Sequence, residues 1–129
     1  MQAVRLSDIK AKHSRHYLQC LISLACRYSK DYITALEAIR SLDTDLPQID
    51  EALSNLGKSI EEVPELSRLA TQALLIAMDL LNLRLSFEQR LKLANIGLKQ
   101  ARNNNEKHAE IHFLNHAGNF NRCLQNAKG

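Results

Sequence analysis

The feature that most restricts the fold of this 129-residue chain is the spacing of its aliphatic residues, which recur every three or four positions along long stretches. The clearest stretch, residues 64–83, would be apolar around most of a helix, at Leu66, Leu69, Ala70, Ala73, Leu74, Ile76, Ala77, Leu80 and Leu81. A helix that is apolar on several sides usually has neighbours on more than one of them. Four glycines and two prolines are too few for a β fold with many tight turns. We therefore predict an all-α domain with this helix at its centre.

The same pattern predicts about six helices, at residues 7–29, 32–42, 47–57, 64–83, 86–102 and 106–127, and no strand. Ser86 and Gln89 form a capping-box pattern, and Asp31 is suited to cap the second helix. The segment LDTDLP is expected to turn the chain, because Pro47 suits the first turn of a new helix. The asparagines at 103–105 should form another turn. Short connections make consecutive helices antiparallel, which gives a stack of helical hairpins.

Composition and charge restrict the partners and the cellular location that we expect for the protein. A formal charge of +3, with basic and acidic residues interleaved, favours a solvated surface, and we expect no nucleic-acid partner. No apolar run is long enough to cross a bilayer, and a signal-peptide core is missing. Cys20 and Cys26 are six residues apart on one predicted helix and cannot pair there, and Cys123 is distant in sequence. These observations predict a single cytoplasmic domain, residues 1–129, with reduced thiols.

Residues 97–119, GLKQARNNNEKHAEIHFLNHAGN, resemble the junction between two tetratricopeptide (TPR) repeats. The residues that carry the resemblance are Gly97, Leu98 and Ala101 before the turn, and Ala109, Leu114, Ala117 and Gly118 after it. The resemblance implies a short right-handed TPR-like array in which small residues admit a neighbouring helix and Leu fills the layer between helices. The sequence departs from the repeat pattern at Asn121, where a large aromatic is expected, and at Gln125, where a turn glycine is expected.

The upstream segment resembles the helical part that follows the nucleotide-binding core in bacterial signalling ATPases of the STAND class (NB-ARC/NACHT-type). The matching residues are Arg15, His16, Leu42, Asp43, Asp45, Ile49, Ala52 and Leu53. No phosphate-binding loop of the G-x-x-x-x-G-K-[ST] type occurs in the sequence. The resemblance therefore implies a regulatory or sensor segment, a fragment of a longer protein, whose partner is a protein, a peptide or another domain of the same chain.

Three histidines, His108, His112 and His116, recur at four-residue intervals in the last predicted helix. Two histidines at this spacing can chelate a transition metal, but a third rotates away on a straight helix, and no H-E-x-x-H arrangement is present. A metal or small-ligand binder is therefore the alternative hypothesis. No order of Ser, Cys, His and Asp indicates catalysis, so we predict a protein that is not an enzyme and has no cofactor.

The favoured hypothesis is a protein–protein interaction module or scaffold. In the TPR register, Asn115, His116, Asn119 and Arg122 would line the concave side of the array and contact the partner. On the other side of the same helix, Ile111, Leu114, Ala117 and Leu124 would form an apolar face with no following helix to cover it. Because repeat arrays need a cap at such an end, we also predict self-association through the C-terminal helix.

Overall fold

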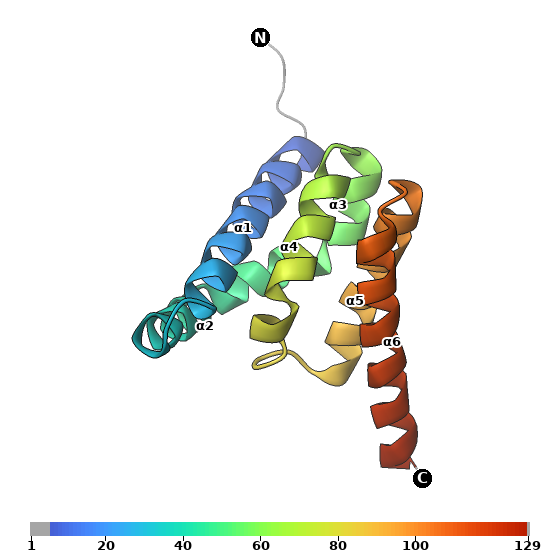
Figure 1. Ribbon diagram of the computed structural model, residues 1–129. Coiled ribbons are helices and arrows are strands. Elements are labelled where there is room, and N and C mark those ends of the chain that lie inside the picture. The colour runs from blue at the N-terminus through green and yellow to red at the C-terminus, as the bar shows by residue number, and fades with distance from the viewer. Residues whose placement is uncertain (1–5, 129) are drawn as a thin grey trace.

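The computed structural model describes the backbone of residues 6–128 and the side chains of residues 9–118. Within this part of the chain all regular elements are α-helices (Figure 1): α1 (Leu6–Tyr28), α2 (Tyr32–Ser54), α3 (Leu56–Glu62), α4 (Leu66–Leu81), α5 (Phe87–Asn103) and α6 (Lys107–Lys128). The predicted all-α class and the number of six helices are confirmed. The helices that begin near residues 7, 64, 86 and 106 also agree closely with the prediction.

Helix α4 is central, as its sequence indicates. Its buried residues lie around most of its circumference: Leu66, Ser67, Ala70, Thr71, Ala73, Leu74, Ala77, Met78, Leu80 and Leu81. The helix packs against α1, α3, α5 and α6, and Figure 1 shows it between α1 and α6. The core around it is mainly aliphatic and includes Leu18 and Leu21 of α1 and Leu93 of α5.

Helices that follow one another along the chain pack together in pairs. Extensive contacts join α1 to α2, α4 to α5 and α5 to α6, as short connections predict. Helix α1 also packs along α4, and α6 reaches α4, so that α1, α4 and α6 form a row from left to right in Figure 1. The short helix α3 contacts α1, α2 and α4. The handedness expected of a TPR-like array stays a prediction.

The predicted turn at LDTDLP is wrong, because α2 continues through it and contains Pro47. A proline inside a helix removes one backbone hydrogen bond and costs about 3 kcal/mol. The buried residues of α2, namely Ala38, Leu42, Ile49, Ala52 and Leu53, lie on both sides of Pro47. Burial of this continuous apolar stripe therefore outweighs the tendency of Pro47 to interrupt a helix. Asp43 and Pro47 are both exposed, so water can reach the carbonyl group of Asp43 that lacks its usual donor. Helix α2 ends later, at Ser54, and Asn55 separates it from α3.

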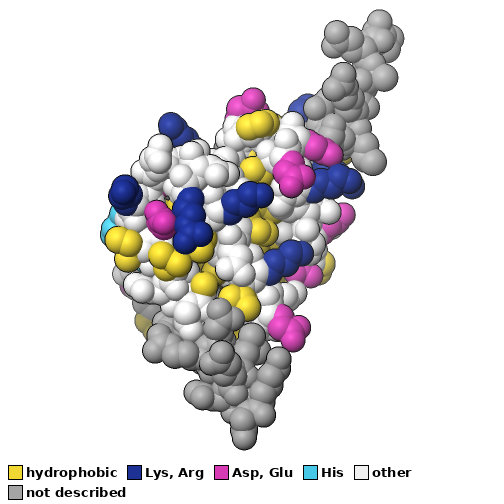
Figure 2. Space-filling model, turned by 90° about the vertical axis from the view of Figure 1, so that its right-hand side faces the viewer, with side chains coloured by type: hydrophobic (Ala, Val, Ile, Leu, Met, Phe, Trp, Pro, Cys, Tyr) yellow, Lys and Arg dark blue, Asp and Glu magenta, His cyan; other side chains and the backbone are white. Residues whose placement is uncertain are grey.

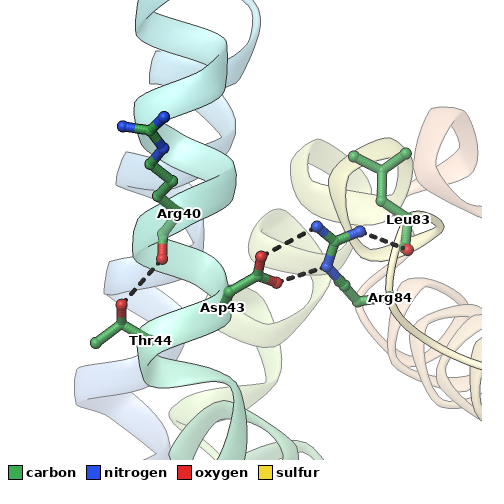
Figure 3. A network of polar contacts seen from close by, with 5 residues as sticks. All are labelled: Arg40, Asp43, Thr44, Leu83 and Arg84. Atoms are coloured by element: carbon green, nitrogen blue, oxygen red, sulfur yellow. Dashed lines mark hydrogen bonds and ion pairs between the residues drawn. The ribbon is translucent and has the colours of Figure 1, made fainter.

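The solvent side of α2 near Pro47 is connected to the end of α4 by side chains. Arg84, in the turn after α4, donates hydrogen bonds from Nε and Nη2 to the two carboxylate oxygens of Asp43, the second at 3.0 Å (Figure 3). Its Nη1 atom also donates to the carbonyl oxygen of Leu83 at 3.0 Å. The guanidinium of Arg84 lowers the pKa of Asp43. This two-point contact holds two exposed segments that are 41 residues apart.

Two predicted helix boundaries have the expected capping geometry. The Ser86 side chain accepts a hydrogen bond from the Gln89 amide at 3.2 Å, and the Gln89 side chain accepts one from the Ser86 amide at 2.9 Å. The Asp31 carboxylate accepts from the Thr34 amide at 2.8 Å and from its hydroxyl at 3.0 Å. At the turn before α6, Asn105 has a φ of 56°, the left-handed conformation that asparagine tolerates.

Candidate functional site

The position of α6 is fixed by one aromatic residue packed on a glycine. Phe113 is completely buried, and its ring lies on Gly97 of α5. A Cβ atom at Gly97 would lie only 2.6 Å from the Cε1 and Cζ atoms of the ring. Gly97 was expected to admit a neighbouring backbone, and the structure shows that it admits an aromatic side chain instead.

The side of α6 that faces the core differs from the TPR-based expectation. Ala109 and Ala117 are buried as expected, but Leu114, expected to fill the layer between helices, is 43% exposed. Phe113 takes the core position beside it. A Cβ atom at Gly118 would meet nothing within 4 Å, so this glycine is not at a close helix crossing. The sequence did hold a signal for the burial of Phe113, because Ala109, Phe113 and Ala117 are spaced by four residues, and such residues share one helix face.

The burial of Phe113 leaves large apolar side chains on the outer surface of the α5–α6 hairpin. Ile111 is 60% exposed, whereas Ala117, predicted for the same face, is buried, and the Leu124 side chain lies outside the described residues. Arg102 of α5 and Glu110 of α6 form an ion pair of 3.1 Å across the hairpin. One helical turn further on, Leu98 and Leu114 therefore lie on the same side. Leu98 is half-buried and packs partly against the core, whereas Leu114 is exposed. We call Leu98, Ile111 and Leu114 the α5–α6 face.

Figure 2 looks onto this side of the molecule. Hydrophobic side chains gather there in a band, with Lys, Arg, Asp and Glu side chains around it. Along α5 the band is continued by an open hollow lined by Glu88, Leu91, Lys92, Asn95, Ile96 and Lys99. An apolar centre with charged residues of both signs around it is a feature through which the C-terminal half could contact another molecule.

The residues predicted to line a concave partner-binding side are only partly described. Asn115 is exposed and His116 is half-buried, both on α6. Asn119 and Arg122 belong to the same helix, but their side chains lie outside the described residues. The two described members are thus available on one helix, and their role in binding stays a prediction.

The histidines of α6 are brought together as a pair and not as a triad. The Nε2 atoms of His112 and His116 are 3.1 Å apart, and the ring centroids are 4.6 Å apart. His108, one turn earlier, is exposed and does not join this pair in any described contact. Among residues 9–118 no group of three His, Cys, Asp or Glu side chains has an arrangement that could hold a metal ion. The three-histidine site of the alternative hypothesis is therefore reduced to two residues.

The surroundings of the pair favour the neutral imidazole of His116. Partial burial is the main cause that lowers the pKa of His116, and the charge of His112 lowers it further. Asp79 of α4 acts in the opposite direction and raises this pKa. The carboxylate of Asp79 thus acts electrostatically on the pair from the neighbouring helix.

A buried polar connection between α4 and the turn before α6 was not predicted. The Ser67 hydroxyl donates to Oε1 of Gln100 at 2.8 Å and accepts from the Asn104 amide group at 2.9 Å. The Thr71 hydroxyl donates a hydrogen bond to the Ser67 carbonyl oxygen at 2.9 Å. Ser67, Thr71 and Gln100 are all buried. The second asparagine of the turn thus has a positioning role that its local sequence does not indicate.

The α1–α2 turn carries a second group of exposed apolar side chains. Tyr32 is 79% and Ile33 is 70% exposed, and Leu36 lies beside an open hollow at the same turn. On α1, Cys20 and Cys26 are free thiols, and the Cys123 side chain lies outside the described residues.

Comparison with known proteins adds no identification. The chain matches no protein-family model, no curated protein and no solved structure. None of the described helices combines the length and apolar character needed to cross a membrane. The resemblances to TPR repeats and to the STAND class stay predictions.

Proposed function

We propose that this protein is a non-catalytic protein–protein interaction module whose α5–α6 face docks an amphipathic helix of a partner. The observation that carries the proposal is the exposure of Ile111 and Leu114 on α6, a helix whose opposite side is anchored by the buried Phe113. An exposed apolar strip on a fixed helix pair is the surface that helix-in-groove recognition uses. The partner helix would present apolar residues at positions i, i+3 or i+4, and i+7.

The charges around the α5–α6 face specify the partner further. Lys92, Lys99 and Lys107 are exposed, and so is Glu88, which lines the hollow along α5. Arg102 and Glu110 are paired with each other. An acidic flank on the partner helix would complement these lysines. Charge complementarity of this kind mainly speeds association and selects the partner, while the apolar contacts supply most of the affinity.

The packing order supports a TPR-like array as the scaffold of this module. In such an array the first helix of each hairpin packs on its own partner helix and on the first helix of the next hairpin. Contacts of α1 with α2 and α4, of α4 with α5 and α6, and of α5 with α6 have this order, with α3 as an addition. The row of α1, α4 and α6 would then carry Asn115, His116, Asn119 and Arg122 toward a second contact with the partner. A regulatory segment of a cytoplasmic STAND-class signalling protein is the setting that the resemblance implies.

The proposal is testable without knowing the partner, because α6 itself is an amphipathic helix with an exposed apolar strip. A second copy of the chain can therefore occupy the α5–α6 face in a two-fold arrangement. Sedimentation velocity over a range of protein concentrations should show a reversible monomer–dimer equilibrium. Ile111→Glu should shift the dissociation constant at least tenfold toward monomer.

The chain offers a matched control for this substitution. Ile33 is a comparably exposed isoleucine on α2 at the other end of the molecule, so Ile33→Glu makes the same chemical change away from the face. It should leave the equilibrium unchanged. A wild-type protein that stays monomeric at millimolar concentration, or equal effects of the two substitutions, would contradict self-association through the α5–α6 face. Circular dichroism of both variants checks that they are folded.

A further inference from the structure

We infer that His112 and His116 form a two-histidine chelate for a divalent transition-metal ion such as Zn²⁺. The pair lies on α6, at four-residue spacing, and is separate from the α5–α6 face proposed for protein binding. The inference goes beyond the proposed function, since it concerns a different ligand class and, apart from His116, different residues.

The distance between the two nitrogen atoms fits bidentate binding. Zinc–imidazole bonds of about 2.0–2.1 Å place two nitrogens about 2.9 Å apart at a right angle and about 3.4 Å apart at the tetrahedral angle. The observed separation of the Nε2 atoms is 3.1 Å, between these limits. One ion can therefore contact both atoms once each ring turns so that its Nε2 lone pair points at the ion and not at the other nitrogen. The nitrogen that now carries the hydrogen must release it, so that this imidazole takes the tautomer with hydrogen on Nδ1.

The pair is supported by the packing of its helix. The His112 ring makes an edge contact with the Phe113 ring, at a centroid distance of 6.2 Å and an interplanar angle of 80°. Phe113 is itself completely buried on Gly97. The backbone that carries His112 is thus fixed to α5, and less conformational freedom is lost when a metal ion binds. Preorganised ligands bind metal ions more tightly than mobile ones.

Charge near the pair also favours a cation. Asp79 of α4 interacts electrostatically with His116, and a positive ion between the imidazoles would experience the same attraction. The two histidines leave coordination positions that no other described side chain fills, since residues 9–118 contain no three-ligand group. Among the described side chains the chelate thus has two protein ligands, His112 and His116, and we expect one ion per chain.

A second pair on α1 provides an internal comparison. The Sγ atom of Cys20 is 3.6 Å from Nε2 of His16, also at four-residue spacing. Zinc binds a cysteine as the thiolate, and both burial and the charge of Asp45 raise the pKa of this thiol. The α1 pair must therefore lose a proton at greater cost before it can chelate, so the α6 pair is the stronger site at neutral pH.

Isothermal titration of the full chain with ZnCl₂ at neutral pH, in a buffer that does not chelate metal, tests the inference. The wild type should bind one Zn²⁺ per chain. His112→Gln and His116→Gln should each weaken binding at least tenfold, because each leaves a single ligand. His108→Gln is the matched control one turn earlier, and Cys20→Ser removes the α1 pair; both should bind like the wild type.

Thermal unfolding followed by circular dichroism gives a second, independent result. Binding to the native state raises the unfolding temperature as the metal concentration increases. Zn²⁺ should raise this temperature for the wild type and for His108→Gln, and much less for His112→Gln and His116→Gln. Absence of binding to the folded wild type, unchanged affinity in both pair variants, or a loss confined to Cys20→Ser would overturn the inference.

Discussion

The hairpins at the two ends of the molecule, α1–α2 and α5–α6, are held together by different kinds of contact. In α1–α2 the helices bury aliphatic stripes, including Leu21 and Leu42, while the polar contacts between them, such as His13 to Gln48 at 3.1 Å, lie near the surface. In α5–α6 a single aromatic ring rests on a glycine, and a buried polar connection fixes the turn to α4. Among the described residues, the first hairpin is held by many similar aliphatic side chains, whereas the largest buried side chain of the second is the Phe113 ring.

The difference determines how each hairpin responds to substitution. A set of interchangeable aliphatic contacts tolerates changes in sequence and allows α2 to include Pro47. The contact of Phe113 with Gly97 makes the position of α6 depend on the fit of two residues, while the small side chains of Ala109 and Ala117 complete its described core face. Ile111, Leu114, His112 and Asn115 can then face outward, and this makes α6 the helix best suited to bind other molecules.

The largest effect is expected for Phe113→Ala. Truncation of a buried phenylalanine leaves a cavity and typically lowers the free energy of unfolding by about 3–5 kcal/mol. Chemical denaturation measures the total loss, and amide hydrogen exchange should show that α6 loses protection before α1 and α2. Leu114→Ala, next to it in sequence but exposed, should cost less than about 0.5 kcal/mol. A loss below about 1 kcal/mol for Phe113→Ala would show that α6 is anchored elsewhere.

A smaller but more specific effect is expected at Gly97. Alanine is favoured over glycine in a helix by about 1 kcal/mol, yet here its Cβ atom would meet the Phe113 ring at 2.6 Å. Because the ring is enclosed, overpacking should dominate, and Gly97→Ala should lower the free energy of unfolding by about 1–3 kcal/mol.

Two other helical glycines are controls for this prediction. At Gly57 in α3 and Gly118 in α6, an added Cβ atom would have no neighbouring atom within 4 Å. Substitution of either by alanine should raise stability by about 0.5–1 kcal/mol. Chemical denaturation of the three variants gives the comparison. If Gly97→Ala were as stabilising as the other two, the Phe113–Gly97 contact would not be the anchor of the hairpin.

The sequence predicts the C-terminal hairpin better than the N-terminal one. The capping box at Ser86, the left-handed Asn105 and the start of α6 follow from local chemistry, and local chemistry decides those positions. The course of α2 through Pro47 does not follow, because burial of residues on both sides of the proline outweighs the local preference. Which preference prevails depends on tertiary packing, which a single sequence does not display.

The candidate site was predictable to a similar extent. The four-residue spacing correctly places His112 beside His116, because helix geometry alone brings such residues together. The same spacing does not tell which neighbouring pair of the three histidines approaches closely. The TPR register also selected Leu114 for the core, whereas the periodicity of Ala109, Phe113 and Ala117 pointed to Phe113. The contact between Phe113 and Gly97 joins two different helices. The sequence shows that both residues are present but not that they meet.

The smallest expected effect is a loss of stability at low pH, which should differ between the two hairpins. Hydrogen bonds from the Thr34 amide and hydroxyl lower the pKa of Asp31, and Arg84 lowers that of Asp43; both carboxylates lie in the α1–α2 half. A carboxylate whose pKa is lower in the native state stabilises that state above the ordinary pKa, about 4, and this contribution is lost as the pH falls through the native-state value. Acidification below about pH 4 should therefore loosen the start of α2 before it affects the α5–α6 hairpin.

Hydrogen exchange of the α2 amides as a function of pH measures this loss. Asp31→Asn keeps a good N-cap but cannot titrate, so it should remove the acid dependence at the start of α2 while leaving protection at neutral pH nearly unchanged. Asp31→Ala should reduce protection at every pH, because the cap itself is absent. If Asp31→Asn kept the full acid dependence, the titrating group would be another carboxylate, and Asp43 would be the next to substitute. The α5–α6 hairpin, whose anchor contains no charge, should show no matching change in any of these variants.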